Sequence, residues 1–180
     1  MKIRLSAVVT CIVAGIVAGP AFALDFPARK PGLWEIQTQT GEATGKGASP
    51  GGGTHTMQQC IDAATDKAMR EMGQGMGKDM CSKQDLRLEG VKLVIDSVCK
   101  IGPTTATSRA VMSGDFSSAY RVESKSTYSP PLMGRTEGTS VVDAKWVGPC
   151  KPGQKPGDMV MGNGMKMNML DAMAKMPPRK

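Results

Sequence analysis

Four cysteines beyond the N-terminal apolar segment constrain the fold of this chain more than any other feature: Cys60, Cys81, Cys99 and Cys150. In an exported chain, an even number of cysteines is typical of a disulfide framework, and four cysteines allow three pairings. A zinc or redox site is not indicated, because no Cys-x-x-Cys pair is present and His55 is the single histidine. We therefore expect two structural disulfides.

The segment between Cys81 and Cys99 indicates how these cysteines pair. Apolar residues alternate with other residues on both sides of Gly90, which is the pattern of a β-hairpin that turns there. In such a hairpin, residues whose numbers sum to about 180 lie opposite each other, and 81 and 99 have this sum. Opposed residues have Cβ atoms about 4.5–5.5 Å apart, close to what a disulfide needs. The sequence predicts a Cys81–Cys99 disulfide and, by elimination, a Cys60–Cys150 disulfide.

An oxidising compartment is expected from the N-terminus. Lys2 and Arg4 precede an apolar run over Leu5–Pro20, which ends in Ala21-Phe22-Ala23, a small-x-small sequence that signal peptidase accepts. The run is shorter than the about 20 apolar residues of a comfortable membrane span. We expect residues 1–23 to be a cleaved signal peptide and the protein to be periplasmic; an N-terminal anchor that is never cut is the alternative.

Length and charge narrow the function classes. Residues 24–180 suffice for one domain. The chain has 23 basic and 16 acidic residues, with the excess of positive charge spread along it, and only seven aromatic residues (three Phe, two Trp, two Tyr). A nucleic-acid binder usually clusters positive charge and interleaves stacking residues. We therefore expect no nucleic-acid partner, and no transmembrane segment after the signal.

Hydrophobic alternation and turn residues predict about seven mostly sequential strands. They cover residues 33–40, 54–60, both arms of the hairpin about Gly90, 104–113, 117–129 and 136–147. Such an order predicts a mainly β fold, with an antiparallel sheet curled into an open barrel or a sandwich. This disulfide-stapled β domain is expected to cover residues 24–150.

Helix signals are weaker and lie in two places. Asp62 can cap a helix over Ala63–Met72 that Gly73 is expected to end, with residues 73–79 irregular. After Cys150 the chain becomes a Pro/Gly/Met-rich tail over residues 151–180, in which Asn168–Lys175 could form a short C-terminal helix.

Several landmarks occur together in a fixed order: Pro31-Gly32-Leu33-Trp34-Glu35 shortly after the signal, Gln59-Cys60 before the first helix, Cys81, Cys99 at a strand end, and Gly148-Pro149-Cys150. In this the chain resembles a bacterial family of exported proteins known only as domain of unknown function 3617. The likeness covers about residues 31–150. It implies an envelope location, and it supplies no active site because none is assigned to the family.

Methionine is the compositional oddity, with 15 residues in the chain. One cluster follows Cys60 with four-residue spacing, and the second lies beyond Cys150 with Met-x-Met spacing. Soft thioethers suit Cu(I), so the second cluster gives the candidate ligands, with His55 as a nitrogen donor: Met159, Met161, Met165, Met167 and Met169. The alternative is that these methionines fill core gaps or cover adaptable surfaces.

No catalytic constellation is apparent. His55 has no Gly-x-Ser-x-Gly nearby and is best explained as a solvated loop residue, and the carboxylates alternate with Lys or Arg as on a solvated strand face. Trp34 and Trp146 are expected in the core, or at the mouth of a ligand-binding barrel. We expect a non-enzymatic periplasmic protein without a cofactor that binds a hydrophobic ligand or an envelope partner; a Met-rich copper-binding protein is the alternative.

Overall fold

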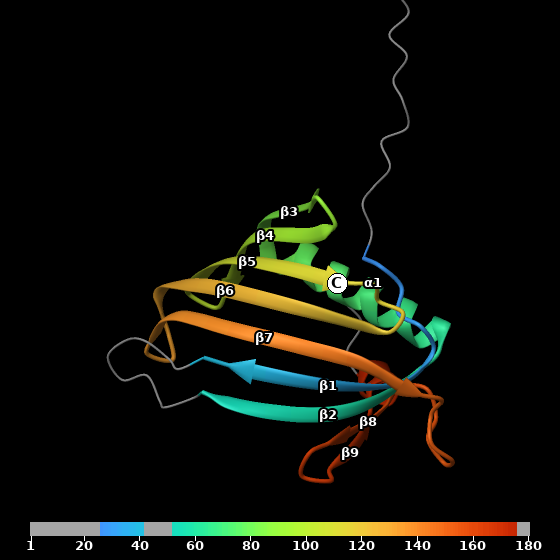
Figure 1. Ribbon diagram of the computed structural model, residues 1–180. Helices are drawn as coiled ribbons and strands as arrows, with labels where there is room; N and C mark the ends of the chain where they lie inside the picture. The colour runs from blue at the N-terminus through green and yellow to red at the C-terminus, as the bar shows by residue number, and fades with distance from the viewer. Residues whose placement is uncertain (1–25, 42–51, 176–180) are drawn as a thin grey trace, which may run out of the picture.

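A computed structural model describes residues 26–41 and 52–175 of the chain (Figure 1). In these parts, nine strands and two helices follow in the order β1 (Gly32–Thr40), β2 (Gly53–Ile61), α1 (Ala63–Met80), β3 (Cys81–Glu89), β4 (Lys92–Ile101), β5 (Thr104–Gly114), β6 (Ala119–Leu132), β7 (Arg135–Gly148), β8 (Asp158–Met161), β9 (Lys166–Asn168) and α2 (Met169–Ala174). The expectation of a mainly β fold is confirmed.

All strands belong to one antiparallel sheet with the order β3-β4-β5-β6-β7-β1-β2-β8-β9. The five strands β3 to β7 are joined by successive hairpins, and β1 then pairs with β7 on one side and with β2 on the other. The sheet curls but does not close into a barrel, since β3 and β9 form its two edges. The sequence predicted an antiparallel sheet curled into an open barrel or a sandwich. The structure has one open, curled sheet.

One face of the sheet carries the hydrophobic core, and it is called the inner face below. Trp34 and Ile36 of β1 are buried on this face, whereas Glu35 and Gln37 between and after them are exposed on the outer face. Ile61 and Ala144 complete the buried cluster. The prediction that Trp34 is a core residue is thus correct, while Trp146 is half-buried against this cluster.

Helix α1 crosses the inner face between distant parts of the sheet (Figure 1). It follows β2 directly and leads directly into β3, which lies at the far edge of the sheet. Its 18 residues span about 27 Å at 1.5 Å per residue. The predicted end at Gly73 is therefore wrong, because the helix continues to Met80. Packing of α1 against β2, β3 and β4 overrides the low helix propensity of glycine here.

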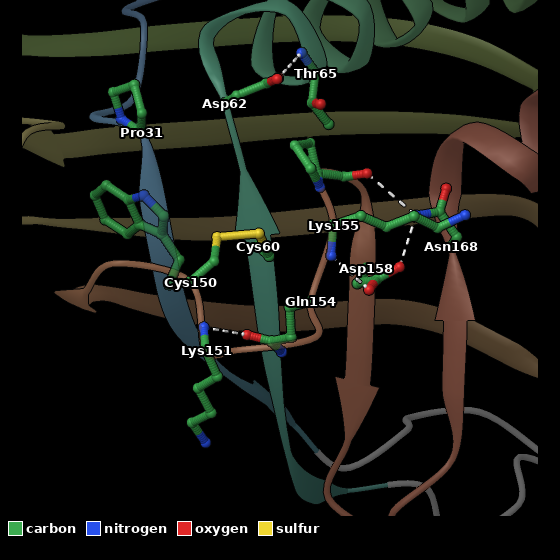
Figure 2. Close-up of a disulfide and its surroundings, with 12 residues drawn as sticks. Pro31, Cys60, Asp62, Thr65, Cys150, Lys151, Gln154, Lys155, Asp158 and Asn168 are labelled. Carbon is green, nitrogen blue, oxygen red and sulfur yellow. Dashed lines mark hydrogen bonds between the residues drawn. A yellow bond between two sulfur atoms is a disulfide. The ribbon is translucent and has the colours of Figure 1, made fainter.

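Both predicted disulfides are present. In the β3–β4 hairpin Cys81 lies opposite Cys99, to which it is bonded. The second bond joins Cys60, near the end of β2, to Cys150, which follows β7 (Figure 2). The turn that opens β1 also lies close by: Gly32 has φ +134°, and a Cβ there would overlap the Trp146 indole nitrogen and a backbone carbonyl. Glycine is the residue that fits this backbone.

The segment after Cys150 extends the sheet. Strands β8 and β9 form a hairpin on the free edge of β2, and α2 lies within the range expected for the C-terminal helix. Polar contacts fix this hairpin (Figure 2): Asn168 Nδ2 donates to Asp158 Oδ1 over 2.7 Å, and the backbone N–H of Lys155 donates to Asp158 Oδ2 over 2.9 Å. Among the helices that the structure describes, none is long and apolar enough to cross a membrane.

Candidate functional site

The segment Phe26–Pro31, called the N-terminal strap below, crosses one end of the inner face. Its backbone accepts hydrogen bonds from both indoles, since Trp34 Nε1 donates to the Lys30 carbonyl over 2.8 Å and Trp146 Nε1 donates to that of Pro31 over 3.0 Å. The Lys30 ammonium lies 3.6 Å from the centre of the Trp146 ring, a favourable cation–π contact. These bonds hold the strap against the core.

A buried ion cluster joins the strap to α1. The Asp66 side chain is only 2% exposed, and it accepts hydrogen bonds from Arg29 Nε over 2.7 Å and from Arg70 Nε over 3.2 Å. The backbone N–H of Arg29 donates a third bond to Asp66 over 3.1 Å. Arg29 Nη1 also donates to Gln59 over 3.1 Å. A buried carboxylate is tolerated only when it is paired and hydrogen-bonded in this way.

The β5–β6 turn places the Phe116 side chain next to the strap and the ion cluster. Asp115 accepts bonds from the Ser118 hydroxyl and from three successive backbone N–H groups, and these bonds hold its pKa well below the ordinary value. This arrangement stabilises the tight turn in which Phe116 adopts φ 56°. Phe116 is buried and stacks on Tyr120, with ring centroids 5.2 Å apart, and Tyr120 in turn contacts Trp34.

The strap, α1 and this turn line a cavity of about 270 Å³ that opens to the surface. Its apolar lining comes from Phe26, Pro27, Met69, Met112, Phe116 and Tyr120. Arg29, Asp66 and Arg70 form its polar wall. The cavity adjoins the core but is not filled by it, and it therefore offers apolar contact to a small hydrophobic group. We call it the strap cavity.

A larger groove of about 620 Å³ lies on the outer face, over β1, β7 and β6. Two of its charged side chains pair with each other: Arg121 donates to both carboxylate oxygens of Asp143 over 2.8 and 2.9 Å. Arg121 also donates to the neighbouring Glu123 over 3.0 Å. The bonds to Glu123 and Asp143 raise the pKa of Arg121. Exposed, mutually neutralised charges of this kind describe a solvated sheet face, so the strap cavity is the better candidate site.

The sequence-predicted copper ligands fall into two groups in the structure. Met159 lies opposite Met167, and Met161 begins the turn that Met165 ends, so these four share the β8–β9 hairpin. Met169 instead begins α2.

His55 is exposed on β2, two residues before Met57, which lies opposite Met161. Sequence reasoning missed Met57. The available signal was His55-x-Met57 within a predicted strand, a spacing that puts both side chains on one face.

Among the described residues, no three His, Cys, Asp or Glu side chains lie close enough to share an ion. All four cysteines of residues 52–175 are bonded in disulfides. Neither observation concerns thioether ligands.

Residues 29–150 match the model of a family described as a protein of unknown function, DUF3617. The chain belongs to this family. The DUF3617 region comprises β1 to β7, α1 and both disulfides, together with most of the strap cavity. The β8–β9 hairpin and α2 lie beyond it. No curated protein and no solved structure matches the chain.

Proposed function

We propose that this protein is exported to the periplasm and acts there as a binding protein, not as an enzyme, with the strap cavity as its site for an apolar ligand. The observation that carries the proposal is the cavity itself, about 270 Å³ of space with six apolar side chains around it. Small-molecule sites typically combine an apolar lining with a few oriented polar groups. The polar wall of Arg29, Asp66 and Arg70 has this character.

The size of the strap cavity indicates the ligand class. Drug-sized ligands occupy about 300–1,000 Å³, so this cavity suits one ring or the end of an acyl chain. Phe116 and Tyr120 are stacked at its wall, and Met69 and Met112 can adapt their side chains to a guest because thioether side chains are flexible. We therefore expect a lipid-like molecule to insert one apolar end.

The chemistry of the titratable groups supports a non-enzymatic role. Among the described residues, each carboxylate whose pKa is clearly displaced has a lowered pKa, and each has a structural reason for this. The Thr65 bond at the start of α1 lowers the pKa of Asp62, and the Asn168 bond in the β8–β9 hairpin lowers that of Asp158. Arg109 and Arg87 do the same for Glu89 and Asp96 on the outer face. The two disulfides support the proposed compartment.

Binding of an apolar fluorescent probe, N-phenyl-1-naphthylamine, tests the proposal. We expect saturable enhancement of its fluorescence, competed by a long-chain fatty acid. Met112→Trp should fill the cavity and abolish binding, although overpacking costs about 1–3 kcal/mol of stability. Val91→Trp is the matched control, because Val91 is 93% exposed in the β3–β4 turn.

Equal probe binding by both tryptophan variants would contradict the assignment of the cavity. Failure of the wild-type protein to bind any probe, together with no lipid detected by mass spectrometry after native purification, would refute the proposed function.

A further inference from the structure

The strand register collects methionines from three strands on one face at the edge of the sheet. Met57 on β2 lies opposite Met161 on β8, and the backbone N–H of Met161 donates to the Met165 carbonyl over 2.8 Å where the β8–β9 hairpin closes. These three residues form one row across the strands. Met159 and Met167, two residues further along, form a second row on the same face.

Core packing explains only part of this set of side chains, since Met57 packs against the buried cluster. Met159 is 7% exposed and behaves as a core residue, but Met165 and Met167 are 57% and 45% exposed. The other face of the same strands carries no methionine at the neighbouring position, where Val160 lies opposite Gln58 and Lys166. At every inward position of the β8–β9 hairpin the chain thus carries a thioether, even where solvent reaches it.

A row of thioether side chains can bind a soft, monovalent cation. They are neutral, polarisable donors that favour Cu(I) over hard ions. Because all cysteines of residues 52–175 are disulfide-bonded, no thiolate competes for the ion in this part of the chain. Side chains directly opposite one another have Cβ atoms about 4.5–5.5 Å apart. Three rotatable bonds per methionine then allow neighbouring sulfurs to converge.

We propose that Met57, Met161 and Met165 form a Cu(I)-binding site with three thioether ligands. His55 lies on the same strand two residues from Met57, diagonal to Met161, within reach of a fourth ligand position. The helix methionine nearest the core is not part of the site, because Met69 Sδ already accepts bonds from Gln59 Nε2 over 3.4 Å and from Arg29 Nη2 over 3.8 Å. The proposal does not rest on ligand binding in the strap cavity.

The site combines residues from inside and outside the family region. Met57 belongs to the matched range of residues 29–150, whereas Met161 and Met165 lie beyond it. Copper binding is therefore expected to depend on the β8–β9 hairpin, which lies beyond the residues that match the family.

Two measurements on the intact protein test the site. Anaerobic titration of Cu(I) with ascorbate and a chromogenic Cu(I) chelator should give one equivalent bound more tightly than micromolar. Methionine methyl resonances, observed after labelling with ¹³C-methyl methionine, should shift for Met57, Met161 and Met165 when Ag(I) is added as a redox-inert substitute. Met161→Leu should weaken Cu(I) binding by at least about ten-fold, the lower end of what losing even an outer-shell partner costs a metal site.

Met133→Leu is the matched control, because Met133 is 88% exposed in the β6–β7 turn and far from the row in the strand order. Leucine conserves volume, so neither variant should unfold the protein, and an unchanged midpoint of urea denaturation verifies this. The proposal is overturned if Met133→Leu weakens Cu(I) binding as much as Met161→Leu does. It is also overturned if Ag(I) shifts the α1 methionines instead, or if no tight equivalent binds.

Discussion

Removal of the buried Asp66 carboxylate tests whether the ion cluster holds the N-terminal strap in place. Asp66→Ala leaves Arg29 without its charge partner, and Arg29 is only 12% exposed. Asp66 accepts three hydrogen bonds as a charged group, and each such bond contributes about 1.5–3 kcal/mol. Adding the three would overestimate the loss of stability, because such contributions are not additive and Arg70 is 23% exposed. Breaking one partner from a buried pair typically costs about 3–5 kcal/mol, which is the loss of unfolding free energy that we expect.

Urea denaturation, followed by tryptophan fluorescence, measures this loss directly. Trp34 reports on the strap because its indole donates to the Lys30 carbonyl. For a chain of this size each kcal/mol corresponds to about 2–4 °C in Tm, so Asp66→Ala should also lower Tm by about 6–20 °C. Asp66→Asn keeps the size and one acceptor oxygen but not the charge, and should recover a minor part of the loss.

The control lies one turn further along the same helix. Glu71 pairs with Lys67 over 3.5 Å, and both side chains are more than half exposed. Glu71→Ala should therefore change stability by no more than about 0.5 kcal/mol. If Asp66→Ala and Glu71→Ala shift the urea midpoint equally, the strap is not held by the cluster and the strap cavity loses its structural basis.

Three further predictions concern the turns and the disulfides. The pKa of Asp115 is lowered in the folded protein. The ionised carboxylate therefore stabilises the fold above its pKa in the unfolded chain, about 3.9, and this stabilisation is lost as the pH falls below that value. Asp115→Asn should flatten the acid side of a plot of Tm against pH. Gly102 has φ +58° in an open turn, where Ala should cost about 1–2 kcal/mol, whereas Gly32→Ala adds a steric overlap and should lower the urea midpoint much further. Replacing both cysteines of Cys60–Cys150 with Ala should lower the free energy of unfolding by about 4–5 kcal/mol, and the same change at Cys81–Cys99 by about 3 kcal/mol. The difference arises because the first bond closes a sequence separation of 90 residues and the second one of 18. Equal losses on urea denaturation would argue against the loop-entropy account.

The sequence predicted the single strands and hairpins whose form depends on the alternation of neighbouring residues. The alternation about Gly90 predicted the β3–β4 hairpin and the Cys81–Cys99 bond, but the register along most of the hairpin differs by one residue. Glu89 lies opposite Lys92, and a register shift next to Cys81 brings the two cysteines opposite each other. The first strand was found because Trp34 and Ile36 alternate with exposed polar residues. In each case the period of two residues carries the information within a single hairpin or strand.

Long-range contacts explain what the sequence left out. Arg29 and Asp66 are 37 residues apart, and nothing in either neighbourhood indicates that they meet. The strap cavity depends on that contact and on a turn that points Phe116 inward, so it could not be placed from the sequence. Strands β8 and β9 have four and three residues, too few for a clear alternation, which is why their composition indicated only a tail.

The glycines of α1 show how the two disulfides and the helix depend on each other. Gly73, Gly75 and Gly77 lie within the helix, and each costs about 1 kcal/mol relative to alanine. Cys60 lies three residues before the helix and Cys81 directly after it, so both ends are tied covalently to the sheet. The combined glycine cost of about 3 kcal/mol is close to what one such bond contributes. A helix of this composition can therefore remain folded across an open sheet because neither end is free to unwind, and the strap cavity keeps the wall that α1 provides.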